Sequence, residues 1–189
     1  FMVIDGHGTA GDGTGIIFSS KANDQGVFRA GSMTWEKGSE INVDSNAYGT
    51  VEITDANQLA VGDILIEELK ASKGTTGSQL TLSITKDGTK DYSFRDAEIQ
   101  TGAQLNIKGK DVALSSVGDV VNKGVIAFDD VTADAPRTTT IAKSAFKKLL
   151  DGSKEGGVLY LGATTDKSLN IVVLSGDEVF DLTEYLGHY

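Results

Sequence analysis

Side chains that carry out chemistry are scarce in this sequence. Its 189 residues contain no Cys and two His, His7 and His188, which lie at opposite ends of the chain. Most enzyme mechanisms use His, Cys or a metal ion held by such residues. There is one Trp, Trp35, and one Pro, Pro136, against 23 Gly. The inventory points away from catalysis, and we predict no catalytic residues.

Three groups of residues carry atoms that suit a metal ion. They are Asp5, His7 and Asp12; Asp129, Asp130 and Asp134; and Asp177 with Glu178. None follows the EF-hand order of spaced acidic positions, a Gly at the sharp turn and a final Glu. Acidic residues in turns are usually only hydrated. We therefore predict no metal site and no cofactor.

The segment Asp5-Gly6-His7-Gly8-Thr9 resembles the His-Gly-Thr signature of subtilisin-like proteases. The resemblance covers about five residues. It implies a Ser nucleophile in a turn that opens a helix, and a separate Asp upstream of the His. Here Ser32-Met33 heads an apparent strand, and almost nothing precedes Asp5. Because a triad needs its three members within hydrogen-bond reach, we predict a Gly-rich loop and not a protease site.

The sequence has features relevant to three ligand or substrate classes. The Gly-rich stretch Gly11–Gly15 precedes a strand, whereas phosphate-binding loops follow a strand and open a helix, so phosphate binding is not expected. A pair among the 27 Asp and Glu would suffice for a glycosidase, but no pair is favoured. Aromatic residues more often pack in a core or an interface than bind sugars. If the chain does bind a glycan, the candidate aromatic residues are Trp35, Tyr48, Tyr92, Tyr160, Tyr185 and Tyr189.

The charge of the chain limits the classes of partner that it is expected to bind. Its net charge is -10 and its pI is near 4.6. Phosphate affinity comes from clustered Lys and Arg, so we expect no nucleic-acid binding. No run approaches the roughly 20 apolar residues of a membrane span, so we expect no membrane insertion. The chain opens with Phe1-Met2-Val3-Ile4, which suggests a processed form or the ordered part of a longer chain.

Alternation of polar and apolar residues predicts many short strands. A hairpin is expected between Leu80–Thr85 and Tyr92–Phe94, because Asp87-Gly88 is typical of a tight turn. A single helical turn is expected at Asp55–Leu59. The segments that follow residue 157 suggest a three-stranded meander. Further strands are expected at residues 16–18, 27–28, 40–44, 50–54, 64–69, 105–107, 112–114 and 125–128.

One segment has helical spacing. Ile141, Ala145, Phe146, Leu149 and Leu150 form one apolar stripe, and Thr138–Thr140 offer hydroxyls for the N-cap. Gly152 is expected to end the helix. We predict an amphipathic helix at about 138–151 that packs on a sheet.

The predicted fold class is mainly β, a β-sandwich or β-barrel with this one helix and an extended N-terminal arm. The arm is expected at residues 1–20. A single β-rich domain is expected at 21–189, with a possible subdivision near 131–137.

The expected function follows by elimination. Apolar residues beside a Gly-rich spacer must be buried somewhere, and addition to a neighbour's sheet edge would bury them. We expect a non-enzymatic structural subunit of a repetitive assembly, a bacteriophage capsid decoration or tail protein, whose partners are copies of itself and other subunits. The expected location is the virion or the cell surface. The alternatives are an extracellular filament or surface-layer subunit, and a glycan- or receptor-binding module.

Overall fold

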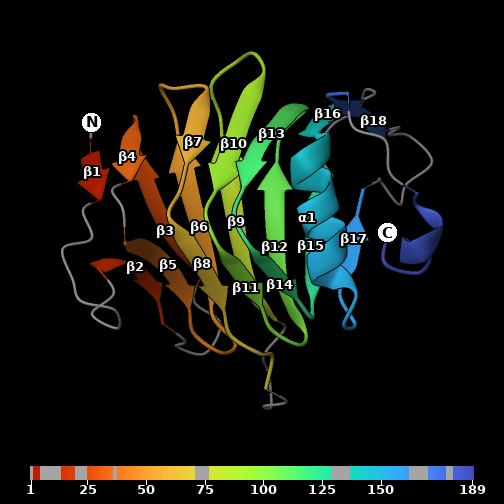
Figure 1. The fold of residues 1–189 in the computed structure, drawn as a ribbon. Helices are drawn as coiled ribbons and strands as arrows, with labels where there is room; N and C mark the ends of the chain where they lie inside the picture. Colours follow the sequence, from red (N-terminus) through yellow and green to blue (C-terminus); the bar gives the residue numbers. More distant parts are fainter. Residues whose placement is uncertain are drawn as a thin grey trace.

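Parallel strand pairing defines the architecture. The computed structural model describes residues 2–4, 14–19, 25–35, 38–70, 77–128, 137–161, 170–177 and 181–189. Within these ranges every strand pair is parallel, and a strand pairs with strands of the adjacent coils and not with its neighbour in sequence. The chain therefore winds into a parallel β-helix, a stack of coils with three sheet faces (Figure 1).

Each face takes one strand from a coil. Face 1 stacks β2 (Thr14–Phe18), β5 (Ser39–Val43), β8 (Asp63–Ile66), β11 (Ala97–Ile99) and β14 (Val120–Asn122). Face 2 stacks β3 (Gln25–Ala30), β6 (Tyr48–Ile53), β9 (Ser78–Ile84), β12 (Ala103–Lys108), β15 (Val125–Phe128) and β17 (Val158–Tyr160). Face 3 stacks β7 (Gln58–Ala60), β10 (Lys90–Phe94), β13 (Asp111–Val117), β16 (Arg137–Ala142) and β18 (Asn170–Ser175). A two-stranded sheet of β1 (Met2–Ile4) and β4 (Met33–Trp35) lies at the N-terminal end.

The core is a set of stacked side chains inside the three faces. Alternate residues of a strand point inward, and parallel register places them one above another at the roughly 4.8 Å strand spacing. Ile41 and Ile64 form part of the column of face 1, and Leu82 and Ile107 part of that of face 2. All four are buried. The alternation read from the sequence therefore reflects an inner and an outer side of each face.

Tyr92 shows how a corner of the stack is fixed. The residue is fully buried at the junction of faces 2 and 3. Its hydroxyl donates to the Lys108 carbonyl at 2.6 Å and accepts the Ile84 N–H at 2.8 Å. One side chain thus ties the ends of two successive face 2 strands together.

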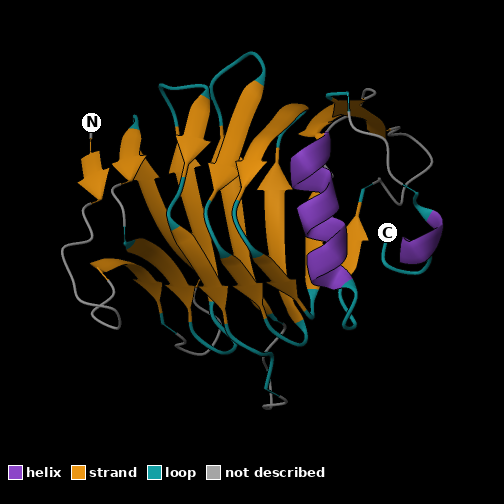
Figure 2. Ribbon diagram, in the orientation of Figure 1, coloured by secondary structure: helices purple, strands orange, loops and turns teal. Residues whose placement is uncertain are grey.

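The helix α1 (Lys143–Ser153) closes one end of face 1. It follows β16 and lies beside β14, where the next coil would place a strand (Figure 2). Its buried side chains are those of Ala145, Phe146, Leu149, Leu150 and Ser153. Burial of Ala145, Phe146, Leu149 and Leu150 is confirmed, whereas Ile141, the first residue of the predicted stripe, lies in β16. The predicted start is wrong, because Thr138–Thr140 belong to β16 and no side chain caps the helix.

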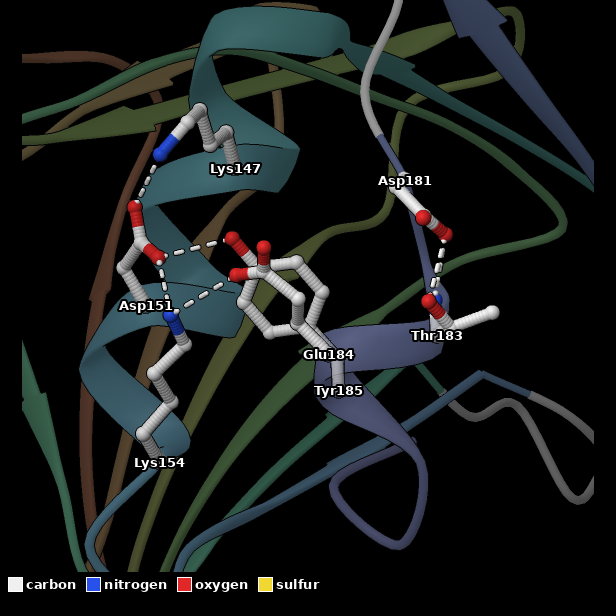
Figure 3. Close-up of polar contacts among 7 residues, drawn as sticks. All are labelled: Lys147, Asp151, Lys154, Asp181, Thr183, Glu184 and Tyr185. Atoms are coloured by element: carbon white, nitrogen blue, oxygen red, sulfur yellow. Dashed lines mark hydrogen bonds and ion pairs between the residues drawn. The ribbon is translucent and has the colours of Figure 1, made fainter.

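The C-terminal segment, residues 181–189, folds back on this end. Tyr185 lies in a short 3-10 helix (Thr183–Tyr185) and is 3% exposed. Its hydroxyl donates to Asp151 Oδ1 at 2.8 Å (Figure 3). Beyond it, the Leu159 N–H of β17 donates to the His188 carbonyl at 2.7 Å. The segment therefore covers part of the outer edge of face 2.

Asp151 is the centre of the polar contacts that hold this segment. Lys147 Nζ lies 2.5 Å from Asp151 Oδ2, and Lys154 Nζ lies 3.3 Å from Asp151 Oδ1. Lys154 also sits 3.5 Å from Glu184 and 4.6 Å from the centre of the Tyr185 ring (Figure 3). Hydrogen bonds, that from Lys147 first, lower the pKa of Asp151 to about 2. The carboxylate therefore stays charged, and these contacts hold, well into acid.

Several sequence-based expectations need correction. The mainly β class is confirmed, but a sandwich or barrel is not, since the sheets are parallel and coil around one core. The hairpin is wrong, because β9 and β10 lie in different faces, and the meander is wrong for the same reason in β17 and β18. Asp55–Leu59 is not helical and leads into β7.

The N-terminal arm at 1–20 is not confirmed either. Its described parts are strands: β1 pairs with β4, and β2 pairs with β5 in face 1. Residues 5–13 lie outside the described residues, as does the stretch 131–136 of the possible subdivision. Within the described ranges, no helix is long and apolar enough to span a bilayer.

Candidate functional site

The connections from face 3 to face 1 repeat a short sequence. They contain Val61-Gly62-Asp63, Phe94-Arg95-Asp96 and Val117-Gly118-Asp119. Ala97 pairs with both Ile64 and Val120, so the three connections lie in register on successive coils (Figure 1). Equivalent residues are therefore stacked at one corner of the β-helix.

A groove runs along this corner. It is open to solvent, has a volume of about 670 Å³ and is lined by Trp35, Val61, Gly62, Phe94, Arg95, Asp96, Ser116, Val117 and Gly118. Two glycines on either side of Arg95 allow the successive connections to stack closely here. A Cβ on Gly62 would lie 2.1 Å from the Ser39 carbonyl oxygen, and one on Gly118 would lie 2.4 Å from Asp96 Oδ1. We call this feature the corner groove.

Arg95 is held in place on the wall of the corner groove. Its Nε and Nη2 donate to the two oxygens of Asp63 at 3.0 and 2.9 Å, a bidentate pair. Backbone N–H groups extend the network along the stack, since Asp96 N–H donates to Asp63 and Asp119 N–H donates to Asp96 Oδ1 at 2.8 Å. The second and third connections are thus each fastened to the preceding one by a carboxylate.

The same corner carries a column of carboxylates: Glu40, Asp63, Asp96 and Asp119. Burial raises the pKa of Glu40, and the charge of Asp63 adds to the rise. Among the described residues, two cations offset the column. Arg95 pairs with Asp63, and Lys148 of α1 lies 4.0 Å from Asp119 at the capped end. The surroundings of the groove remain acidic.

Replacing Glu40 by Gln is expected to raise the free energy of unfolding by a few tenths of a kcal/mol near pH 7. A carboxyl whose pKa is raised on folding opposes folding once it ionises, so the gain should vanish below its unfolded pKa, near pH 3. Urea unfolding at both pH values measures this. Glu98→Gln, at an exposed position of face 1, serves as the control. A loss of stability for Glu40→Gln near pH 7 would contradict the assignment.

Of the metal-ligand candidates weighed in the sequence, the described residues include only Asp177. Asp5, His7, Asp12, Asp129, Asp130, Asp134 and Glu178 lie outside the described residues. Asp177 is exposed in the turn after β18. His188 contacts the Gly157 carbonyl through Nδ1 at 3.1 Å, at the capped end. Within the described ranges there is no group of three or more His, Cys, Asp or Glu suited to a metal ion.

The aromatic candidates are dispersed as well. Tyr92 and Tyr185 are buried, and Tyr48 and Tyr160 lie on different strands of face 2. Of the six candidates, only Trp35 lines the corner groove. Its indole N–H is buried and has no hydrogen-bond partner among the described residues. Trp35 is therefore the one groove residue among the aromatic candidates identified from the sequence.

Arg95, Asp96 and Ser116 were missed. A signal existed, because an apolar residue, then Gly or Arg, then Asp and a second apolar residue recur at 61–64, 94–97 and 117–120. Such a recurrence indicates stacked turns only once the coils are recognised. Without them, each Gly-Asp pair is only an ordinary turn signal.

The chain matches no protein-family model, and no curated protein or solved structure is detectably similar to it. The chemistry of the corner groove therefore has to be judged from its own residues. It offers an aromatic ring, a fixed guanidinium, a carboxylate and a hydroxyl, which are groups that bind a ligand.

Proposed function

We propose that this chain is a non-enzymatic structural subunit of a repetitive assembly, built by sheet-edge contacts between copies. A bacteriophage capsid decoration or tail protein is the specific case, and an extracellular filament or surface-layer subunit is the alternative. Its partners are then copies of itself and other subunits of the assembly, on a virion or a cell surface. The proposal includes no cofactor, nucleic-acid binding or membrane insertion.

The observation that carries the proposal is where exposed apolar side chains lie. Ile17 and Val27 are 63% and 55% exposed on β2 and β3, the outermost described strands of faces 1 and 2. At the other end Val173 of β18 and Leu186 are exposed, at 43% and 69%. Exposed apolar groups on edge strands favour association, because pairing with another chain buries them.

The two ends differ in what they offer a neighbour. At the C-terminal end, α1 covers face 1 and residues 181–189 cover part of face 2. The outer edge of β18 on face 3 has no strand partner in the described part of the chain. Its sequence, Asn170–Ser175, contains none of the charges or prolines that usually block edge pairing. Addition of a copy at this end would therefore use β18.

We expect the purified chain to associate in a concentration-dependent manner, as measured by light scattering during size exclusion. Val173→Lys and Val27→Lys should each weaken association at least about tenfold, since they place a charge in the edge contact. Leu69→Lys, at a position 39% exposed after β8, is the matched control. A strictly monomeric chain at high concentration would sink the proposal.

A further inference from the structure

We infer that the corner groove binds an uncharged saccharide. The inference does not rest on assembly of the chain, because the groove is complete within one copy. Its volume of about 670 Å³ falls within the range of roughly 300–1,000 Å³ that ligand pockets occupy. The groove also extends across successive coils, which gives it the elongated form that suits an oligosaccharide.

The apolar lining comes from rings and aliphatic groups. Trp35 enters from β4, and Val61, Phe94 and Val117 line the groove from successive coils. Sugar rings carry C–H groups on one side, and an aromatic face packs against such groups. Because Val61, Phe94 and Val117 are nearly fully buried, the half-buried Trp35 is the ring best placed to contact a ligand.

The polar lining supplies both donors and acceptors. Among the described residues, Arg95 uses Nε and one N–H of Nη2 on Asp63, which leaves the second N–H of Nη2 and the two of Nη1 for another acceptor. Asp96 accepts the Asp119 N–H through Oδ1, and within the described residues no hydrogen bond uses its Oδ2. Ser116 adds an exposed hydroxyl. A sugar hydroxyl both donates and accepts, so adjacent hydroxyls match a guanidinium beside a carboxylate.

The groups are also held still. The Arg95 and Asp63 side chains are 41% and 33% exposed and are joined by two hydrogen bonds. Asp96 is fixed from both sides, because its N–H donates to Asp63 and its carboxylate accepts from Asp119. Prearranged groups lose little conformational freedom when a ligand binds.

Charge selects the class of saccharide. Asp96 lines the groove, Asp63 and Asp119 lie in register with it on the adjacent coils, and Arg95 is the cation among the described lining residues. A uronic acid or sulfated sugar would meet repulsion, and so would a nucleotide. An uncharged sugar meets none, and it can use the Asp96 carboxylate as an acceptor.

The test is titration calorimetry with hexasaccharides of glucose, mannose and galactose. Oligogalacturonate serves as the anionic probe and oligoglucosamine as the cationic one. We expect at least one neutral series to bind and oligogalacturonate not to bind. Trp35→Ala should weaken binding about tenfold, and Tyr189→Ala, an exposed aromatic residue away from the groove, should leave it unchanged.

Two further variants keep the test decisive if Trp35→Ala unfolds the chain. Ser116→Ala removes an exposed hydroxyl and should weaken binding about fivefold. Asp96→Asn retains an acceptor for the Asp119 N–H and should reduce the discrimination against oligogalacturonate. Absence of binding to every neutral series would overturn the inference, as would binding that none of the groove variants alters. Binding of the cationic probe alone would assign the groove to cations instead.

Discussion

Replacing Asn122 by Ala is expected to lower the free energy of unfolding by roughly 2–4 kcal/mol. The side chain is fully buried, and Asn122 is the last residue of β14. Its Nδ2 donates to Ser153 Oγ at 2.9 Å and to the Val158 carbonyl at 3.2 Å, and its Oδ1 accepts the Gly124 N–H at 3.0 Å. Alanine leaves that buried N–H without its acceptor, and it also leaves a cavity.

Because of its position, Asn122 stabilises the whole C-terminal end of the β-helix. Ser153 is the last residue of α1, and its hydroxyl donates in turn to the Leu149 carbonyl at 2.8 Å. Val158 begins β17 of the next coil. One amide therefore joins face 1, the helix and face 2. Buried networks of this kind lose more than one hydrogen bond when a member is removed.

Urea unfolding followed by circular dichroism measures the effect. Asn106→Ala is the matched control, because Asn106 lies half-buried on the outer side of face 2, and we expect it to cost less than about 1 kcal/mol. Asn122→Asp should be more destabilising than Ala near pH 7, since it buries a charge. Its cost should fall as the pH is lowered and the carboxyl protonates. Equal, small effects for Asn122→Ala and Asn106→Ala would show that the network does not hold the end.

Strand positions could be predicted from sequence because alternation is a local property. Residues 50–54 alternate, and β6 has buried Val51 and Ile53 between half-buried neighbours. Alternation says which side chains share a side, but it does not say which strand lies next to which. The expected hairpin shows the difference. Asp87-Gly88 does turn the chain, yet it turns from face 2 to face 3 and not back along β9.

The coiling itself escaped prediction because its period is irregular. The paired residues Ile41, Ile64 and Ala97 are separated by 23 and then 33 residues. Extra residues in the longer coil lie between β8 and β9 and between β9 and β10. Loops at corners can lengthen without disturbing the stacked strands, so the structure repeats where the sequence does not show a fixed period.

The buried side of the helix was predicted correctly from the sequence, but the residue at which the helix begins was not. Ala145, Phe146, Leu149 and Leu150 are buried as their spacing predicts. The threonines before them extend a strand, because Thr139 is buried on the inner side of β16, where it pairs with Val112 and Val172. β-branched residues suit a strand, and here the tertiary pairing outweighs their value as caps.

Gly62 lies in one of the connections that form the corner groove, where a side chain would meet the preceding coil. Gly62→Ala is expected to lower the free energy of unfolding by about 3 kcal/mol. The new Cβ would lie 2.1 Å from the Ser39 carbonyl oxygen and 2.8 Å from its carbonyl carbon, both backbone atoms of the preceding coil. Relief requires the two connections to separate, which would strain the pairing of β5 with β8.

Gly77→Ala is the matched control, because its Cβ would meet side-chain atoms, Gln79 Nε2 at 3.0 Å and the Tyr48 hydroxyl at 3.2 Å. The Gln79 side chain can shift, so we expect a change within about 1 kcal/mol of zero. Thermal and urea unfolding of both variants measure the difference. If Gly62→Ala were as stable as Gly77→Ala, the coils would not stack as closely at this corner as the corner groove requires.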